Sequence, residues 1–280
     1  MLFNVSLCIS NKIPEFHMNK TALITGSSGG IGSELAKVHA RNGDNLILLG
    51  LDKVRLDVLK KDLESEYKVK VYTIEKDLTL PGAVEDIYSE LKDQGILVDY
   101  LINNAGMGDF GLFAGSSWLK QEKMINLNIV ALTHLTRLFL PEMIKIGSGK
   151  IMNVASTASF QPGPTMAVYF ATKAYVLSFS EALSNEVRDK GITVTALCPG
   201  STETGFHAVV MGDGSFLKER KKSSPAEVAE FGYRSMMKGK TVAIHGFKNV
   251  LMANSVRFFP RALVAGVTRK IQEKKHLKNI

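Results

Sequence analysis

A tyrosine and a lysine four residues apart, Tyr169 and Lys173, are suited to proton transfer. Residues at positions i and i+4 of a helix lie on the same face. A free phenol has a pKa of about 10 and exchanges protons poorly at neutral pH, whereas a nearby ammonium favours the phenolate and lowers that pKa. The pair therefore predicts a proton donor for a carbonyl oxygen, although the same spacing also occurs in pairs without any chemical role.

A glycine-rich turn with the sequence TGSSGGIG occupies residues 25–32, between a predicted strand and a predicted helix. Gly26 permits a tight turn, Gly30 lets a pyrophosphate approach the backbone, and Gly32 lets the helix pack closely on the strand. The free N–H groups of the helix N-terminus attract phosphate. Glycine spacing alone is weak evidence, but this position between a strand and a helix predicts a dinucleotide site.

These residues need a scaffold, and short apolar runs alternate with helical patterns over most of the chain. Strands are predicted at Lys20–Thr25, Asn45–Leu49, Val69–Glu75, Tyr100–Asn103, Lys150–Ala155 and Thr193–Cys198. Helices are predicted at Ile31–Asn42, Arg55–Glu66, Gly82–Lys92, Tyr169–Arg188 and, with a break at Pro141, Trp118–Ile146. Alternation of this kind implies parallel strands joined by right-handed crossovers. We therefore predict an α/β fold, a single doubly wound Rossmann-like domain whose mostly parallel sheet has helices on both faces.

The pattern is weaker after residue 200. A helix is predicted from the capping sequence at Ser224 to about Lys238, and Thr241–His245 is a candidate last strand. Val250–Ile271 is apolar and basic at helical spacing, with an interruption at Pro260. We expect a dispensable N-terminal extension at residues 1–17, or a true start at Met18. A catalytic domain at 18–249 and a basic amphipathic segment at 250–280 would follow.

The motifs, taken in order, resemble those of the short-chain dehydrogenase/reductase family. The glycine turn is similar to the family's TGxxxGxG, Asn103–Gly106 to its NNAG, Tyr169–Lys173 to its YxxxK, and Pro199-Gly200 to its PG motif. The resemblance covers about residues 19–205, and the ordered set is far more specific than any single motif. It implies an enzyme that interconverts a carbonyl and a secondary alcohol by hydride transfer, with Tyr169 as the acid and base.

The resemblance also implies roles for individual residues. The catalytic set would be Asn128, Ser156, Tyr169 and Lys173, with Asn126 as a rival for Asn128 and with Thr157 and Ser159 as rivals for Ser156. The cofactor would contact Gly26, Ser28, Gly30, Ile31, Gly32, Asp77, Leu78, Asn104, Ala105, Gly106, Tyr169, Lys173 and Thr204, with Thr202 as the alternative to Thr204. No metal site is expected.

The end of the second predicted strand bears on the choice between NAD and NADP. A carboxylate there favours NAD and an arginine nearby favours NADP. Gly50 and Leu51 occupy the family's acidic and basic positions, and its other basic position is Gly29. Because the carboxylate is missing and Lys53 and Arg55 follow closely, we expect NADP, with NAD as the alternative.

Composition narrows the remaining function classes. The net charge is +8, but no zinc-finger spacing or RNA-binding signature accompanies it, so we expect no nucleic-acid partner. Two cysteines give no disulfide framework, which favours the cytoplasm. The basic segment after residue 250 packs on the domain, forms a subunit interface or contacts an anionic membrane. We expect a homo-oligomer.

Loops at residues 107–118, at 157–167 and after 204 are rich in glycine and apolar residues, and they predict an apolar mouth for a small-molecule carbonyl or alcohol substrate. Two other function classes stay open, a redox sensor that binds the cofactor without turnover and a membrane-surface protein. Sensors of that kind commonly lose the tyrosine or the lysine, both of which this chain keeps.

Overall fold

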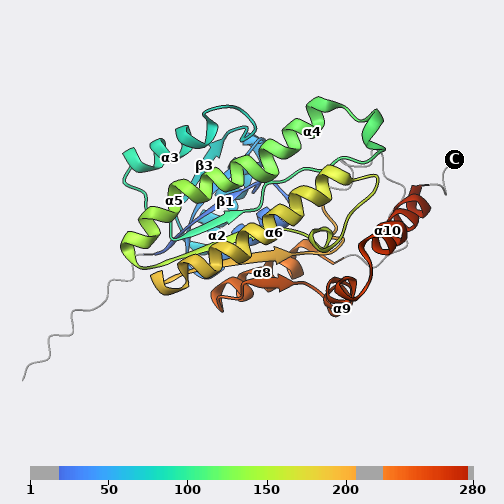
Figure 1. Cartoon of the computed structure of the whole chain (residues 1–280). Helices are drawn as coiled ribbons and strands as arrows, with labels where there is room; N and C mark the ends of the chain where they lie inside the picture. Colours follow the sequence, from blue (N-terminus) through green and yellow to red (C-terminus); the bar gives the residue numbers. More distant parts are fainter. Residues whose placement is uncertain (1–18, 206–222, 277–280) are drawn as a thin grey trace, which may run out of the picture.

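The computed structural model describes residues 19–205 and 223–276, and the side chains up to residue 273. The predicted N-terminal extension at residues 1–17 lies outside the described residues, as does the loop beyond residue 205 that was assigned to the substrate mouth. Figure 1 shows a central sheet between two layers of helices, with the C-terminal helices at one end of the molecule. The predicted doubly wound α/β domain is therefore confirmed.

Seven parallel strands form one sheet in the order β3-β2-β1-β4-β5-β6-β7. The strands are β1 (Thr21–Thr25), β2 (Asn45–Gly50), β3 (Val71–Glu75), β4 (Tyr100–Asn103), β5 (Gly149–Val154), β6 (Ile192–Cys198) and β7 (Val242–Ile244). The chain moves outward from β1 on one side as far as β3, then crosses back so that β4 lies on the other side of β1. Sheets of this kind bind ligands at such a switch point, beyond the carboxyl ends of the strands.

Helices cover both faces of the sheet. One face carries α1 (Gly30–Arg41), α2 (Lys53–Tyr67) and α8 (Pro225–Met237). The other face carries α3 (Ala83–Asp93), α5 (Leu132–Ile146) and α6 (Ala167–Val187), and α4 (Trp118–Ile125) leads into α5. The start of α8 has the predicted capping box, in which Ser224 and Glu227 satisfy each other's backbone N–H groups.

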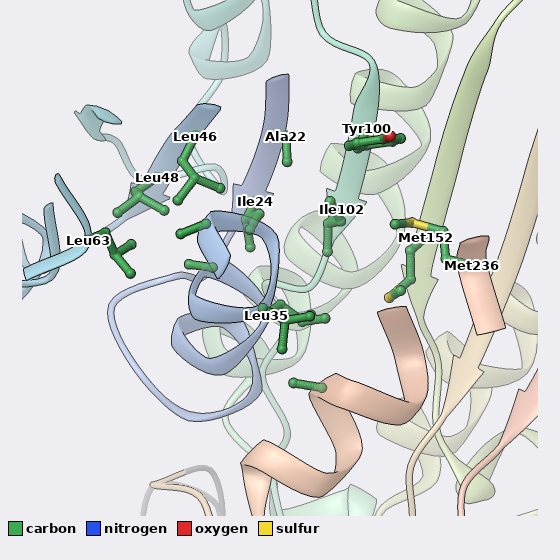
Figure 2. Close-up of a cluster of buried hydrophobic side chains, with 14 of the residues drawn as sticks. Ala22, Ile24, Leu35, Leu46, Leu48, Leu63, Tyr100, Ile102, Met152 and Met236 are labelled. Atoms are coloured by element: carbon green, nitrogen blue, oxygen red, sulfur yellow. The ribbon is translucent and has the colours of Figure 1, made fainter. Parts of the chain in front are cut away.

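Side chains of the central strands are buried on both faces, which explains their continuous apolar sequences. In β1, Ala22 and Ile24 point toward α1, whereas Leu23 joins the core beneath α5. Figure 2 shows the first of these cores, where Leu35 of α1 meets residues of β1 and β2. The central strands are therefore held between two apolar cores.

Pro141 does not break the helix predicted over residues 118–146. The irregular segment is instead a π-helical turn, Asn126–Ala131, which separates α4 from α5. Proline removes the N–H that would bond to the carbonyl of residue 137, but Pro141 and Arg137 both lie on the exposed side of α5, where water can hydrate that carbonyl. The prediction of a break at Pro141 was wrong because it ignored which side of the helix the proline occupies.

The C-terminal part forms α9 (Phe247–Ser255), a short 3-10 turn (Val256–Phe258) and α10 (Arg261–His276). Pro260 separates the turn from α10, which confirms the predicted interruption. Within the ranges that the structure describes, no helix has both the length and the apolar character needed to span a bilayer.

Candidate active site

Asn104 fastens the glycine turn to the loop that follows β4. Its side-chain amide donates to the backbone oxygens of Thr25, at 2.9 Å, and Gly26, at 3.2 Å. In return, Oγ1 of Thr25 accepts from the backbone N–H groups of Asn104 and Ala105, both at 2.9 Å. Because β1 and β4 are neighbours at the switch point, these contacts join two of the sequence-predicted cofactor segments into one surface.

The glycines of the turn are required by its shape. Gly26 and Gly30 have φ angles of +66° and +59°, in the left-handed region that other residues avoid. A Cβ atom on Gly32 would lie 2.2 Å from the carbonyl oxygen of Gly26. No side chain caps the start of α1, and its first turn carries no acidic residue. The N–H groups of that turn are thus available to a pyrophosphate, and the cradle fits a dinucleotide.

The end of β2 carries no carboxylate of the kind that favours NAD, and it leaves little room for one. A Cβ atom on Gly50 would lie 3.1 Å from Oγ of Ser28, so Ser28 fills the space beside this strand. The guanidinium of Arg55 approaches the turn instead, with Nη1 4.0 Å from the position of a Cβ on Gly29. Arg55 also pairs with Asp52, at 3.1 Å from Nε to Oδ2. A cation next to the glycine turn is therefore supplied by α2.

The residues expected to flank the adenine follow β3. Asp77 accepts hydrogen bonds from the backbone and the hydroxyl of Thr79, at 2.9 and 2.7 Å, which shapes the loop. Leu78 is buried in the core beneath α5, with 7% of its surface exposed. A contact between Leu78 and a cofactor would therefore involve its backbone more than its side chain.

Tyr169 and Lys173 lie one turn apart on α6, as their spacing predicted. Burial raises the pKa of Tyr169 to about 12, and a hydrogen bond with Ser156 acts in the opposite direction. The side chain that moderates the phenol in this structure is thus Ser156. The expectation that the Lys173 ammonium would hold the pKa of Tyr169 below its ordinary value is not met here, because burial has the larger effect.

Lys173 is buried beneath the loop that follows β4. Its Nζ donates to the backbone oxygen of Val154 at 2.7 Å, and a Cβ on Gly106 would lie 3.3 Å from the same nitrogen. Burial lowers the pKa of Lys173 to about 8. A lysine with such a pKa can exchange a proton near neutral pH.

Asn128 belongs to the π-helical turn, and its amide is fully engaged. It accepts from the backbone N–H of Met107 at 3.0 Å and donates to the backbone oxygen of Met107 at 2.9 Å. It also donates to the hydroxyl of Thr172 at 3.0 Å. Of the two candidate asparagines, Asn128 is the one with these contacts to the loop and to α6, whereas Asn126 is half-buried on the same turn.

The rivals of Ser156 have other contacts. Ser159 donates from Oγ to the backbone oxygen of Lys173 at 2.7 Å, and it thereby anchors α6. The backbone N–H of Thr157 donates to the carbonyl of Pro199 at 2.9 Å. Ser156 is the member of this group that shares a hydrogen bond with Tyr169. The sequence did not indicate that Ser159 and Thr172 anchor α6. The available signal was their position, since Thr172 lies within the YxxxK motif and Ser159 follows Ser156 by three residues.

The structure also distinguishes between the two candidate threonines after Pro199-Gly200. Thr204 lies against the glycine turn, with its Cγ2 atom 3.1 Å from the position of a Cβ on Gly30. Thr202 is buried and donates to the backbone oxygen of Gly200 at 3.1 Å. Thr204 therefore has the better position for contact with a bound dinucleotide.

A small apolar cluster packs against the tyrosine. Ala158, Met166 and Phe170 form a small buried cluster, and Phe110 and Tyr169 pack against it. The two predicted substrate loops meet where the N–H of Gly111 donates to the carbonyl of Thr165 at 2.8 Å. The reacting oxygen of a substrate would thus lie near polar groups while its body meets an apolar wall.

Comparisons with known proteins agree with this architecture. A family model described as short chain dehydrogenase matches residues 20–212. The chain is 34% identical over 188 residues to the human very-long-chain 3-oxoacyl-CoA reductase, a match that covers 65% of this chain and 59% of that protein. A solved short-chain dehydrogenase from Sphingobium yanoikuyae, in complex with NADPH, matches with a TM-score of 0.77 and 34% identity, covering 85% of this chain and 93% of that one.

A second solved structure is similar, the bulky-bulky ketone specific alcohol dehydrogenase from Comamonas testosteroni. It matches with a TM-score of 0.74 and 32% identity, over 85% of this chain and 92% of that one. Sheet, glycine turn and family match together place the molecule among the Rossmann-type oxidoreductases. Within that class, the chain belongs to the short-chain dehydrogenase/reductase family.

Proposed function

We propose that this protein reduces apolar ketones to secondary alcohols with NADPH, and that Tyr169 provides the proton. The observation that carries the proposal is the hydrogen bond between Ser156 and Tyr169, one helical turn from the buried Lys173. NADPH, when bound, supplies the hydride that the carbonyl carbon accepts. The glycine turn and the N-terminus of α1 would hold its pyrophosphate.

The chain's own residues handle the proton and the orientation of the substrate. Ser156 and Tyr169 would both bond to the carbonyl oxygen, and the phenol O–H would give its proton to that oxygen as the alcohol forms. Burial keeps Tyr169 protonated at neutral pH, which suits a proton donor. Lys173 would then return a proton to the phenolate, and Asn128 shapes the turn beside it.

Arg55 and Gly50 support NADPH over NADH. A 2′-phosphate near the glycine turn would meet the guanidinium of Arg55, and the carboxylate that would repel it is replaced by Gly50. The similar Sphingobium yanoikuyae enzyme was solved in complex with NADPH.

The apolar wall around Phe110, Met166 and Phe170 supports a bulky, mainly apolar substrate. Two similar proteins are named for large substrates, one for a very-long-chain 3-oxoacyl-CoA and the other for a bulky-bulky ketone. We propose ketones with long or bulky apolar substituents as the substrate class.

A panel of ketones and secondary alcohols, assayed with NADPH and NADH, tests the proposal. Tyr169→Phe should still fold and bind NADPH, measured by fluorescence titration, and lose about 10²–10⁴-fold in turnover. Near-full turnover by this variant would reject the role of Tyr169. Cofactor binding without turnover of any member of the panel would instead favour the redox-sensor alternative.

A further inference from the structure

The last helix buries two polar residues and leaves a row of apolar residues exposed. Thr268 and Gln272 are 5% and 7% exposed, whereas Leu263, Val267 and Ile271 are 53%, 49% and 45% exposed. The three apolar residues recur every fourth position and therefore share one side of α10. A helix that only covers its own domain buries its apolar side. In α10, by contrast, the row of three apolar residues is exposed.

The helix and the turn that precede α10 also expose apolar side chains. Exposed apolar side chains of α9 and of the segment before α10 are Phe247 (83%), Leu251 (63%), Phe258 (84%) and Phe259 (54%). Together with the three residues of α10 they form what we call the apolar face. Figure 1 shows α9 and α10 (red) at the same end of the molecule. Exposed apolar clusters of this size mark interaction sites in soluble domains.

Positive charge accompanies the apolar face. Lys248, Arg257, Arg261, Arg269 and Lys270 are all exposed. Glu273 is the single acidic residue of the sequence between residues 247 and 280, and it is paired with Arg269 at 2.6 Å. A surface with exposed phenylalanines among arginines and lysines matches the interface of a bilayer with anionic headgroups.

We propose that the apolar face binds the surface of an anionic lipid bilayer. The phenylalanine and leucine side chains enter the boundary between headgroups and acyl chains, and the basic side chains contact the headgroups. A second copy of the chain is a poorer occupant, because a two-fold interface would bring the same basic side chains of both copies together.

Docking would bring the bilayer close to the candidate active site. Nε2 of Gln272 lies 3.9 Å from Sδ of Met166, whose cluster also packs against Tyr169. On the other side, α9 lies against the loop after β6, since a Cβ on Gly200 would be 2.4 Å from Nδ2 of Asn249. If the proposed function holds, apolar ketones dissolved in the bilayer would approach from the end of the molecule where α10 packs against the cluster beside Tyr169. The docking itself does not depend on that function.

Vesicle flotation with the full chain tests the proposal. The protein should float with vesicles that contain phosphatidylglycerol and stay in solution with pure phosphatidylcholine vesicles. The double variant Phe247→Glu/Phe258→Glu, and separately Arg257→Glu/Arg261→Glu, should each weaken binding by about tenfold or more. Val58→Glu/Leu97→Glu alters two exposed apolar residues outside the apolar face, 55% and 49% exposed, and should float like the unmodified protein.

Three outcomes would overturn the docking proposal: no flotation with either vesicle, equal flotation of all variants, or a dimer in light scattering that Phe247→Glu/Phe258→Glu dissociates while no protein floats. The last outcome would assign the face to a second copy of the chain. Turnover of a water-soluble ketone, measured on the same samples, should be unchanged in the Phe247→Glu/Phe258→Glu variant. A failure of flotation with normal turnover would thus reject docking and leave the proposed function intact.

Discussion

The side-chain amide of Asn128 donates a hydrogen bond of 3.0 Å to the hydroxyl of Thr172. That hydroxyl in turn donates to the backbone oxygen of Tyr169 at 2.8 Å. Both partners are almost completely buried, with 1% of each residue exposed. The contact joins the π-helical turn to α6, so the position of Asn128 depends on the helix that carries Tyr169 and Lys173.

Replacing Thr172 by valine should therefore disturb Asn128 without touching the reacting groups. The unpaired amide would shift the turn, and we expect kcat to fall about ten- to a hundredfold. The dissociation constant of NADPH should hardly change. Thr172→Ser, which keeps the hydroxyl, should retain most of the activity. Equal kcat values for the two variants would contradict this role.

Gly32→Ala should prevent normal cofactor binding. Its new Cβ would lie 2.2 Å from the carbonyl oxygen of Gly26, so the glycine turn has to move. We expect a loss of about 1–3 kcal/mol in the free energy of unfolding and a much weaker NADPH complex. Thermal unfolding and fluorescence titration measure the two effects.

Gly29→Ala is the matched control for Gly32→Ala. Gly29 has extended backbone geometry, with a φ angle of 173°, and the nearest atom to an added Cβ is Nη1 of Arg55 at 4.0 Å. The Gly29→Ala variant should fold and bind the cofactor normally. If both glycine variants behave alike, the close approach at Gly32 is not what shapes the turn.

Arg55→Ala should raise the KM for NADPH about tenfold and leave the KM for NADH nearly unchanged, because only NADPH carries the phosphate that the guanidinium would bond. Lys61→Ala removes an exposed charge further along α2 and serves as the control. An unaltered ratio of the two KM values in Arg55→Ala would show that another group selects the cofactor.

The buried Lys173 should make stability depend on pH. Its pKa in the folded protein is lowered to about 8, whereas an unfolded lysine has a pKa of about 10.4. Between these values the unfolded chain binds more protons, so the free energy of unfolding rises with pH. From about pH 7.5 to about pH 9.5, we expect an extra rise of about 1–2 kcal/mol relative to Lys173→Met.

Urea denaturation of both proteins at the two pH values measures this difference. The other groups with shifted pKa values, such as Lys150, are common to both proteins, so they cancel in the comparison. Parallel changes with pH in the two proteins would mean that Lys173 keeps its proton in the folded state.

The strands and most helices were predictable because their signals are local. Continuous apolar sequences such as that of β2 specify strands buried on both faces, and the glycine turn marks the junction of β1 and α1. The spacing of Tyr169 and Lys173 was also a local signal, since both lie on one helix. The contact between Asn104 and Thr25, by contrast, joins residues 79 positions apart and has no local signature.

Two features could not be predicted from the sequence, and the reason is physical. Helical periodicity at residues 261–276 reveals an apolar side, but it does not say whether that side meets the protein or the solvent. The pKa of Tyr169 depends on burial by neighbouring elements, which spacing along α6 does not describe. In both cases the missing information lies in tertiary packing.

The apolar face lies after β7, whereas Asn128, Ser156, Tyr169 and Lys173 all come from segments that precede residue 205. If both proposals hold, the reaction and the place where it occurs are encoded by different stretches of the chain. Changes to the exposed side chains of α9 or α10 would then redirect the protein to another surface and leave the residues proposed to transfer the proton unchanged. The fold would in this sense be modular, and its location could evolve at a different pace from its chemistry.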